Sequence, residues 1–356
     1  MEGFRPRNSV DHVTLVRHRD LVSTGEESDV ERRVWARLPD GTFEALHGLP
    51  ATDLQTLLLT VARNRAARVK PPDLLRRWRK DRFVRPASGD PRRLAAVETQ
   101  LWQLLPAEVD GVELSPLVPL GTSSALGPIS QNRIVTTMRS AEVLSDSTNA
   151  LAIEAADRRL RQPSTGHVHL AASHRQLRAQ RYQAGMSAHF HLFALVSSGR
   201  DVGSGATQAS MLTLHLAYWQ RVLAAILPSV RPQLRYTVFD SPGMRERIHD
   251  TVLPALANAR HTSDAVPVVE EPDRERGRGY YADVALRITA GHDGNAVELG
   301  DGGFTTWTGQ LMGNAKERCL ISCIATDRLA AAGNTHRASG AGTQQPRPEH
   351  RPAEDP

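Results

Sequence analysis

Residues 168–199, VHLAASHRQLRAQRYQAGMSAHFHLFALVSSG, contain two apolar runs separated by a polar stretch with one glycine. This pattern predicts two antiparallel strands joined by a loop. Arg178 lies at the end of the first strand, and His189 and Phe193 lie near the start of the second. An arginine, an aromatic ring and a polar side chain at the end of such a pair can bind a nucleotide. The alternative is that Arg178 and His189 are ordinary cross-strand partners.

Helices and further strands flank this pair. Apolar residues at helical spacing, together with N-cap and proline signals, predict helices at 51–69, 90–105, 145–161, 206–227 and 243–258. Thr52 or Asp53 is the expected N-cap of the first of these. Residues 10–48 are predicted to form short strands, with a hairpin turn at Pro39-Asp40-Gly41. Long antiparallel strands interleaved with helices indicate the α+β class.

The composition of the chain predicts three parts. Residues 1–88 are predicted to form a small basic N-terminal α+β domain and residues 89–331 a second domain, with the stretch 86–95 as the linker that leads into it. Residues 332–356 have almost no large apolar side chain, which predicts a disordered tail.

The overall composition excludes several protein classes. Of the 356 residues, 40% are hydrophobic and 23% are charged, which is inconsistent with a mainly disordered chain. No apolar run reaches the ~20 residues that a spanning helix needs, so no membrane association is expected. The only cysteines, Cys319 and Cys323, exclude a disulfide scaffold and a four-thiolate zinc site. The expected location is the reducing cytoplasm.

Residues 61–95 are strongly basic, with twelve Lys or Arg residues against three Asp residues. Trp78 and Phe83 lie between the basic residues. Such a segment can bind a nucleic-acid backbone and stack on its bases. It can equally be a solvated surface on which arginine stems cover apolar area.

Two further stretches carry candidate binding residues. In ISCIATDRL, Arg328 lies where an apolar strand passes into a helix, a position that suits an anion. RGRGYY (276–281) is followed by VELGDGGFTTW (297–307), in which Gly302 and Gly303 permit close backbone approach.

Taken in order, these stretches resemble the catalytic domain of class II aminoacyl-tRNA synthetases, most closely the histidyl-tRNA synthetase branch. LRAQ, its loop and HFHLF resemble motif 2, and RGRGYY resembles the histidyl Arg-Gly-Leu-Asp-Tyr-Tyr element. DGGFTTWTGQLMG is similar to the histidyl Gly-Gly-Arg-Tyr-Asp stretch, and ISCIATDRL to motif 3. DSTNALAIEAADRR occupies the place of motif 1 and its helix. The resemblance covers about residues 90–330.

The resemblance implies a fold, a reaction and partners. The fold would be an antiparallel six-stranded sheet flanked by helices, in a homodimer. The reaction would use ATP and Mg²⁺ to convert an amino acid into an aminoacyl-adenylate, for transfer to tRNA, a carrier or a small acceptor.

The resemblance also implies roles for individual residues. Arg178 and Arg276 would be catalytic, with Arg178 on the α-phosphate. The ATP-binding set would be Arg178, Gln180, His189, Phe193, Glu298 and Arg328, with Phe193 stacked on adenine and Glu298 also a candidate metal ligand. Tyr280, Tyr281, Gly302 and Gly303 would line the amino-acid pocket.

Several positions depart from the family pattern. Gln180 replaces the motif 2 acid, Ala325 replaces the motif 3 glycine, and Gly279 replaces the aspartate before the tyrosine pair. About 27 residues follow Arg328, too few for an anticodon-binding domain. Three functions therefore compete: a stand-alone amino-acid-activating enzyme, a catalytically silent regulatory or ligand-binding subunit, and an RNA-binding protein that uses residues 61–95.

Overall fold

The computed structural model describes residues 28–127, 129–162, 166–180, 187–258, 266–291 and 296–333. The chain divides into two compact units. In the described residues, the first unit contains 28–71 and 138–140, and the second contains 72–137 and the part from 141 onward. The strands predicted before residue 28, residues 181–186 of the predicted loop and the predicted tail from residue 334 onward lie outside the described residues.

The described part of the first unit is helical: α2 (Asp29–Trp35), α3 (Thr42–His47) and α4 (Ala51–Ala66). The helix predicted at 51–69 is confirmed, but its N-cap is Pro50 rather than Thr52 or Asp53. The strands predicted within 28–48 and the hairpin at 39–41 are wrong. Ser28 and Glu31 instead form a capping box that starts α2, and Gly41, with φ of 79°, is the N-cap of α3.

The second unit is built on a mixed, mostly antiparallel sheet of eight strands, which confirms the α+β class but corrects the predicted number of six. The strand order is β1-β4-β5-β10-β9-β8-β6-β7, and only the pairs β1–β4 and β6–β7 are parallel. The strands are β1 (Asp110–Gly111), β4 (Val168–Leu177), β5 (His189–Arg200), β6 (Pro232–Val238), β7 (Val268–Glu270), β8 (Ala282–Ala290), β9 (Val297–Thr305) and β10 (Glu317–Ala325). A separate small sheet pairs β2 (Leu117–Pro119) with β3 (Ala141–Val143).

Helices precede, connect and follow these strands. They are α5 (Pro71–Lys80), α6 (Pro91–Gln103), α7 (Thr122–Leu126), the 3₁₀ helix η1 (Gln131–Arg133), α8 (Ser147–Arg161), α9 (Ala206–Ile226), α10 (Pro242–Arg247), the π-helical η2 (Ile248–Val252), α11 (Leu253–Asn258), α12 (Trp307–Met312) and α13 (Thr326–Ala332). Asp90 caps α6 ahead of Pro91, as predicted. None of the helices in the described part of the chain is both long and apolar enough to cross a membrane.

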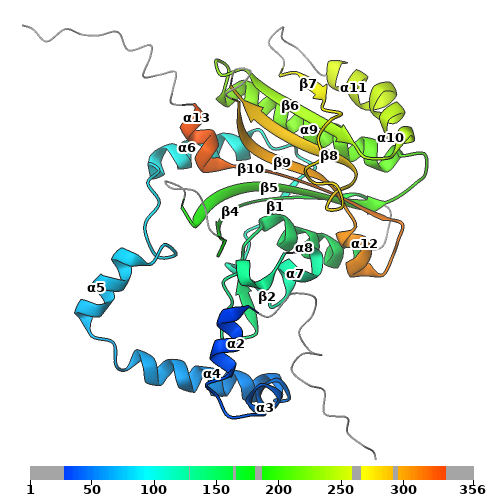
Figure 1. Ribbon diagram of the computed structural model, residues 1–356. Helices are drawn as coiled ribbons and strands as arrows, with labels where there is room; N and C mark the ends of the chain where they lie inside the picture. Colours follow the sequence, from blue (N-terminus) through cyan, green and yellow to red (C-terminus); the bar gives the residue numbers. More distant parts are fainter. Residues whose placement is uncertain are drawn as a thin grey trace, which may run out of the picture. The chain divides into compact units, whose positions relative to one another are not determined.

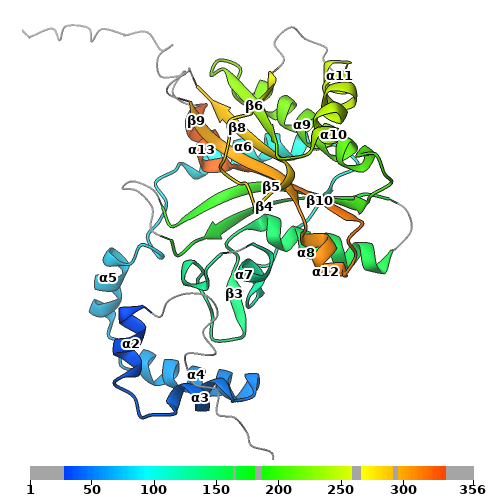
Figure 2. The same cartoon turned by 45° about the vertical axis from the view of Figure 1, so that its right-hand side comes forward.

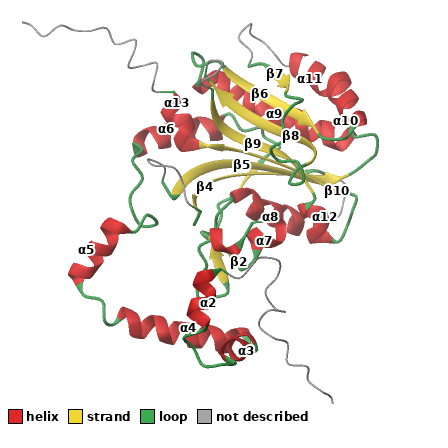
Figure 3. Ribbon diagram, viewed as in Figure 1, coloured by secondary structure: helices red, strands yellow, loops and turns green. Residues whose placement is uncertain are grey.

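Helices α8 and α9 cover opposite faces of the sheet (Figures 1 and 3). The turned view in Figure 2 shows the same arrangement around β4, β5 and β10. The larger core cluster lies between α9 and the sheet and contains Trp219 and Tyr218, both fully buried. The smaller cluster lies between α8 and the sheet and contains Leu151 and Ala155.

The alternation of β5 assigns each of its residues to one of these faces. Phe193 and Leu195 pack in the α9 cluster, whereas Leu192 and Ala194 pack in the α8 cluster. Because successive side chains of a strand point to opposite faces, Phe190 lies on the α8 face with Leu192.

A buried ion pair joins α8 to the start of β10. Arg159 Nη2 lies 3.0 Å from Glu317 Oε1, and Arg159 Nε donates to Glu317 Oε2 at 3.2 Å. Only 6% of the Arg159 side chain and 2% of the Glu317 side chain are exposed. The two parallel hydrogen bonds fix the position of α8 on the sheet.

Replacing Arg159 with Met should lower the free energy of unfolding by about 3–5 kcal/mol, because Glu317 would keep a buried charge without a partner. Urea unfolding measures this loss. The matched control is Arg161→Met, which removes the more exposed pair with Asp157 on the same helix and should cost no more than about 1 kcal/mol. Equal losses in the two variants would contradict the role given to the buried pair.

Candidate functional site

The second unit contains a cavity of about 740 Å³ on the α8 face of the sheet. Its wall combines the ends of β5, β9 and β10, the N-terminus of α8, the loop before β8, and α13. These segments are far apart in the sequence, and the sheet order places their strands next to one another.

Five arginines line this cavity, and three of them are the arginines selected from the sequence. The three are Arg178, Arg276 and Arg328, and Arg133 and Arg274 join them. Four carboxylates, of Asp146, Glu298, Asp301 and Asp327, line the same space. A cavity with this set of groups can bind an anionic ligand while fixing the orientation of its neutral and cationic parts.

Arg178 is held at the N-terminus of α8. Its Nε donates to the Ser145 carbonyl at 2.7 Å, and its Nη2 lies 3.2 Å from Asp146 Oδ2. Asp146 is also the N-cap of α8 and accepts from the Thr148 amide at 3.0 Å. The Arg178 guanidinium lies 5.2 Å from the centroid of the Phe190 ring. The site therefore places a cation beside an aromatic face.

Arg276 and Arg328 meet at Glu298. Arg276 Nη1 donates to both carboxylate oxygens of Glu298 at 3.0 Å, and Arg328 Nη1 donates to the Glu298 carbonyl at 3.0 Å. Arg287 Nε lies 3.2 Å from Glu298 Oε2. Three guanidinium groups thus gather around one residue of β9.

Glu298 was also the predicted metal ligand. Within the described ranges no group of three or more His, Cys, Asp or Glu side chains is placed to hold a metal ion. Mg²⁺ is commonly bound by one or two carboxylates and by the phosphates of the nucleotide. The carboxylate of Glu298 fits such a shared site only if Arg276 releases it, because that arginine now contacts both of its oxygens.

Phe193 does not line the cavity. Its side chain is fully buried on the α9 face, where it contacts Trp102, Tyr218 and Trp219. The ring predicted to stack on adenine thus lies outside the cavity, and the phenylalanine on the cavity wall beside Arg178 is Phe190.

His189 and Gln180 line the cavity but are tied to neighbouring groups. Arg175 Nη1 lies 2.9 Å from His189 Nδ1, and His189 Nε2 lies 2.6 Å from the Arg85 carbonyl. Because a carbonyl only accepts, Nε2 carries the proton and Nδ1 accepts from Arg175. The backbone carbonyl of Gln180 accepts from Arg82 at 2.5 Å, which leaves its amide side chain for the cavity.

The tyrosine pair lines the cavity, whereas the two predicted glycines lie behind it. Tyr280 and Tyr281 meet edge to face at 4.8 Å between centroids. A Cβ on Gly303 would lie 2.5 Å from the Tyr281 ring, and one on Gly302 would lie 2.4 Å from the Ile321 carbonyl. Gly302 and Gly303 therefore make room for the strand and the ring, and it is Gly300 that faces the cavity.

Asp301 is a cavity residue that the sequence analysis missed. It follows Gly300 on β9 and accepts from the Tyr281 hydroxyl at 3.2 Å. Burial raises the pKa of the Asp301 carboxyl above its usual value, and the charges of Asp146 and Glu298 raise it further. Its position before Gly302-Gly303 is typical of a turn, so the two glycines were selected from the sequence and Asp301 was not.

Ala325 ends β10 and lines the cavity just before α13. Its methyl group occupies the position at which the family pattern has a bare glycine backbone. At this position the cavity wall therefore has a methyl group where the family pattern has none.

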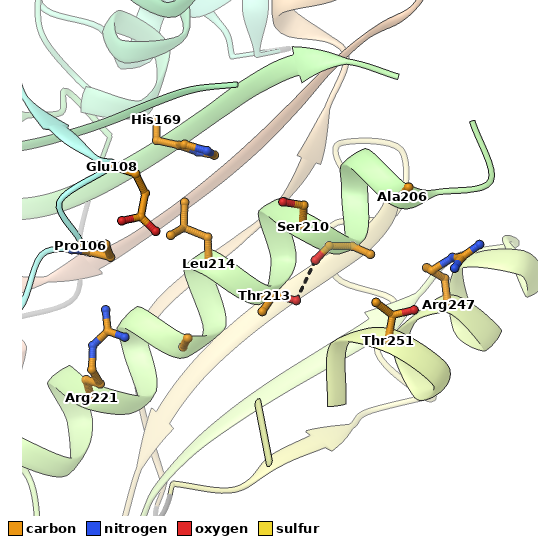
Figure 4. Close-up of a pocket in the computed structure, with 12 residues that line it drawn as sticks. Pro106, Glu108, His169, Ala206, Ser210, Thr213, Leu214, Arg221, Arg247 and Thr251 are labelled. Atoms are coloured by element: carbon orange, nitrogen blue, oxygen red, sulfur yellow. Dashed lines mark hydrogen bonds between the residues drawn. The ribbon is translucent and has the colours of Figure 1, made fainter. Parts of the chain in front are cut away.

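A second cavity, of about 470 Å³, lies along α9 (Figure 4). Glu108, His169, Arg221 and Arg247 contribute its charged or titratable groups. The pKa of His169 is lowered to about 4, chiefly by burial. With two arginines against one acid, this cavity is a weaker candidate than the five-arginine cavity.

His169 is the outer end of a buried hydrogen-bonded chain. Ser197 Oγ lies 2.6 Å from His169 Nδ1 and 2.8 Å from His215 Nε2, and His215 Nδ1 lies 2.8 Å from Ser322 Oγ. Trp219 Nε1 donates to the same Ser322 oxygen at 2.8 Å. This series of hydrogen bonds pairs the polar groups that are buried between the sheet and α9. Their presence is therefore explained by packing, without a bound ligand.

Comparison with known proteins identifies the fold. No family model matches the chain, and no curated protein matches it. Among solved structures, apo histidyl-tRNA synthetase of S. aureus matches with a TM-score of 0.54 and 16% identity, over 72% of this chain and 68% of that chain. Histidyl-tRNA synthetase from Nostoc sp. PCC 7120 matches with a TM-score of 0.53 and 13% identity, over 73% of this chain and 75% of that chain.

A third solved structure is described as an ATP phosphoribosyltransferase regulatory subunit/histidyl-tRNA synthetase from Bacillus halodurans C. Its TM-score is 0.51 at 13% identity, and the match covers 71% of this chain and 83% of that chain. The chain is thus structurally similar to class II aminoacyl-tRNA synthetase catalytic domains, mostly those of histidyl-tRNA synthetases and their paralogues, which confirms the resemblance noted in the sequence. At these identities the likeness establishes the fold.

Replacing Asp301 with Asn should make the protein progressively more stable than the parent as the pH rises. In the parent, the Asp301 carboxyl has a higher pKa in the folded state than in the unfolded state, so the folded protein binds more protons. The parent therefore loses stability as the pH rises from the unfolded-state pKa of about 3.9 through the folded-state pKa, whereas the variant has no carboxyl at this position. Melting temperatures of parent and variant between pH 4 and 8 measure the difference. A difference that stays constant with pH, or that comes to favour the parent, would refute the assignment.

Proposed function

We propose that this chain activates an amino acid with ATP, forming an aminoacyl-adenylate that is passed to tRNA, a carrier or a small acceptor. The observation that carries the proposal is the presence of Arg178, Arg276 and Arg328 around one cavity. The similarity to synthetase catalytic domains gives a fold on which such a cavity can perform this reaction.

In the proposed reaction an oxygen of the amino acid's carboxylate attacks the α-phosphorus of ATP. The bond from this phosphorus to the bridging oxygen breaks, and pyrophosphate leaves. The protein's contribution is to align the two reactants and to neutralise negative charge on the phosphates. Mg²⁺, when bound with the nucleotide, supplies further neutralisation, and Glu298 is the residue proposed to hold it.

The proposed roles are those that the resemblance implies, adjusted where the contacts of a residue require it. Arg178 binds the α-phosphate and Phe190, not Phe193, stacks on the adenine, because these two side chains lie together. Arg328 contacts the γ-phosphate side, and Gln180 accepts from the adenine amino group. Tyr280 and Tyr281 bind the amino acid.

Binding of ATP requires an exchange of ion-pair partners. Arg178 now contacts Asp146, and Arg276 contacts Glu298, so phosphate oxygens would replace carboxylates as acceptors. The exchange keeps each guanidinium paired, and the released carboxylates become available to a metal ion or to the ammonium group of the amino acid.

A ligand-binding regulatory subunit is the second candidate. The arginines of the cavity have acceptors within the chain itself, Gln180 lacks the charge of the family's acid, and Ala325 narrows the adenine surface. The similarity to a structure described as a regulatory subunit favours the same conclusion. Such a protein would bind a ligand in the cavity without releasing pyrophosphate.

RNA binding by residues 61–95 is supported by the surface of α5. Its residues Arg76, Arg77, Arg79 and Lys80 are exposed, and Trp78 is 48% exposed among them. Cations with an exposed indole between them suit a phosphate backbone and its unstacked bases.

A homodimeric assembly and a cytoplasmic location remain predictions.

Replacing Arg328 with Ala should weaken ATP binding about 10- to 100-fold, since one charge-assisted contact to phosphate is lost. Isothermal titration with ATP and Mg²⁺ measures the affinity, and circular dichroism checks that the fold is kept. Arg245→Ala, which removes an exposed arginine paired with Glu270, is the control and should bind ATP like the parent. Unchanged ATP affinity in the Arg328 variant would place the nucleotide elsewhere.

Replacing Arg77, Arg79 and Lys80 together with Gln should reduce affinity for a transfer RNA and lower the slope of log affinity against log salt by about one to three. Filter binding at several salt concentrations provides the measurement. If the triple variant binds RNA as the parent does, with the same slope, α5 is only a solvated surface.

A further inference from the structure

We propose that Asp301 determines the specificity of the main cavity, and that the amino acid bound there carries a cationic side chain, an ammonium or guanidinium group. The inference rests on the proposed function, because it assumes that an amino acid is the second ligand of this cavity. It adds the chemical class of that amino acid.

The position of Asp301 follows from the strand register. Asp301 on β9 lies opposite Cys323 on β10, whose side chain belongs to the α8 side of the sheet. Both residues line the cavity together with Tyr280 and Tyr281. Asp301 therefore points into the region assigned to the amino acid.

The polar contacts of Asp301 are with neutral groups. Oδ2 accepts from the Tyr281 hydroxyl at 3.2 Å, and Oδ1 lies 3.8 Å from the Cys323 thiol sulfur. The carboxylate has no ion pair with any Lys, Arg or His in the described part of the chain.

The neighbouring cations are directed to other acceptors. Arg274 donates to the carbonyls of Arg276 and Leu286, both at 2.8 Å. Arg287 is the cross-strand partner of Asp301 on β8, but its guanidinium contacts Glu271 at 2.8 Å and Glu298 at 3.2 Å.

Two of the other three acids of the cavity differ from Asp301 because they form ion pairs. Asp146 is paired with Arg178, and Glu298 is paired with Arg276. Asp327 accepts from the backbone amide of His191 beside the first turn of α13. Asp327, like Asp301, has no ion pair in the described residues, but it lies in the first turn of α13, where the helix N-terminus favours a negative charge. Asp301 has no ion pair and no such helix terminus, and the charge of Arg274 offsets only part of the effect of its burial. A buried carboxylate without an ion pair is unfavourable.

The surroundings of Asp301 suit an organic cation. The edge-to-face pair of Tyr280 and Tyr281 gives an aromatic wall, and the buried Trp307 packs against Tyr280 with 6.0 Å between the ring centroids. A cation bound here would contact a carboxylate and aromatic rings at once. Gly277 and Gly303 leave room for the Tyr281 ring, whose hydroxyl in turn orients Asp301.

The raised pKa of Asp301 agrees with this geometry, because burial without a cation disfavours the ionised form. A bound ammonium or guanidinium group would favour the carboxylate again. Binding of a cationic ligand should therefore release protons at a pH near the folded-state pKa.

The test compares amino acids that differ in charge but little in shape. Isothermal titration of the full chain uses L-lysine against L-norleucine, and L-arginine against L-citrulline, with no ATP present. We expect one cationic member to bind at least tenfold more tightly than its neutral counterpart. In Asp301→Asn this preference should fall to less than threefold, while Asp273→Asn, an exposed residue outside the cavity, should keep it.

Equal binding of the charged and neutral members would overturn the proposal, as would a preference that persists in Asp301→Asn. Failure of every cationic probe to bind at millimolar concentration would overturn it as well. Release of pyrophosphate from ATP is measured separately. If the protein binds cationic amino acids selectively but releases no pyrophosphate, the proposed enzymatic function is contradicted and the role of Asp301 stands. If pyrophosphate is released with neutral amino acids and with no cationic one, the role of Asp301 is contradicted and the enzymatic function stands.

Discussion

The two-residue period of the strands is the constraint on which the rest of this structure depends. Along β5, β9 and β10 one set of side chains packs against α9 and forms the larger core. The other set faces α8 and, at the end of the strands, the cavity. A shift of one residue in any of these strands would move cavity residues into the core and core residues into the cavity. The site is therefore specified by the same packing that stabilises the sheet.

The second constraint is the balance of charge in the cavity. Five arginines would repel one another if acids did not separate them, and Asp146 and Glu298 supply those acids. This pairing stabilises the protein without a ligand and fixes the guanidinium groups at the cavity wall. Asp301 has no ion pair with these arginines, which is the observation behind its proposed selection of a cation.

The sequence located the arginines of the site because chemistry and motif order both mark them. Arg178, Arg276 and Arg328 were selected from separate stretches, and all three reach one cavity. The aromatic ring was misplaced because Phe190 and Phe193 lie in one apolar run, and only the packing of α9 decides which face of β5 is core. Asp301 was missed because its importance comes from partners on other strands.

The fold class could be predicted, but some elements could not. Strands β1 and β7 contain two and three residues, too few to show a period, and they add to the six antiparallel strands that the family resemblance implied. In residues 28–48, alternating apolar and polar residues predicted strands. None of the residues in α2 and α3 is buried, however, so no packing against a core stabilises an extended conformation there. Local capping by Ser28 and Gly41 decided the outcome there.

The central claim is that the converging arginines activate an amino acid with ATP. Exchange of labelled pyrophosphate into ATP, measured for each proteinogenic amino acid in turn with the full chain, tests it most directly. The account predicts exchange that depends on a particular amino acid and that is lost in Arg178→Ala. Absence of exchange with every amino acid, in protein that still binds ATP, would contradict it and leave a ligand-binding subunit as the function of this cavity.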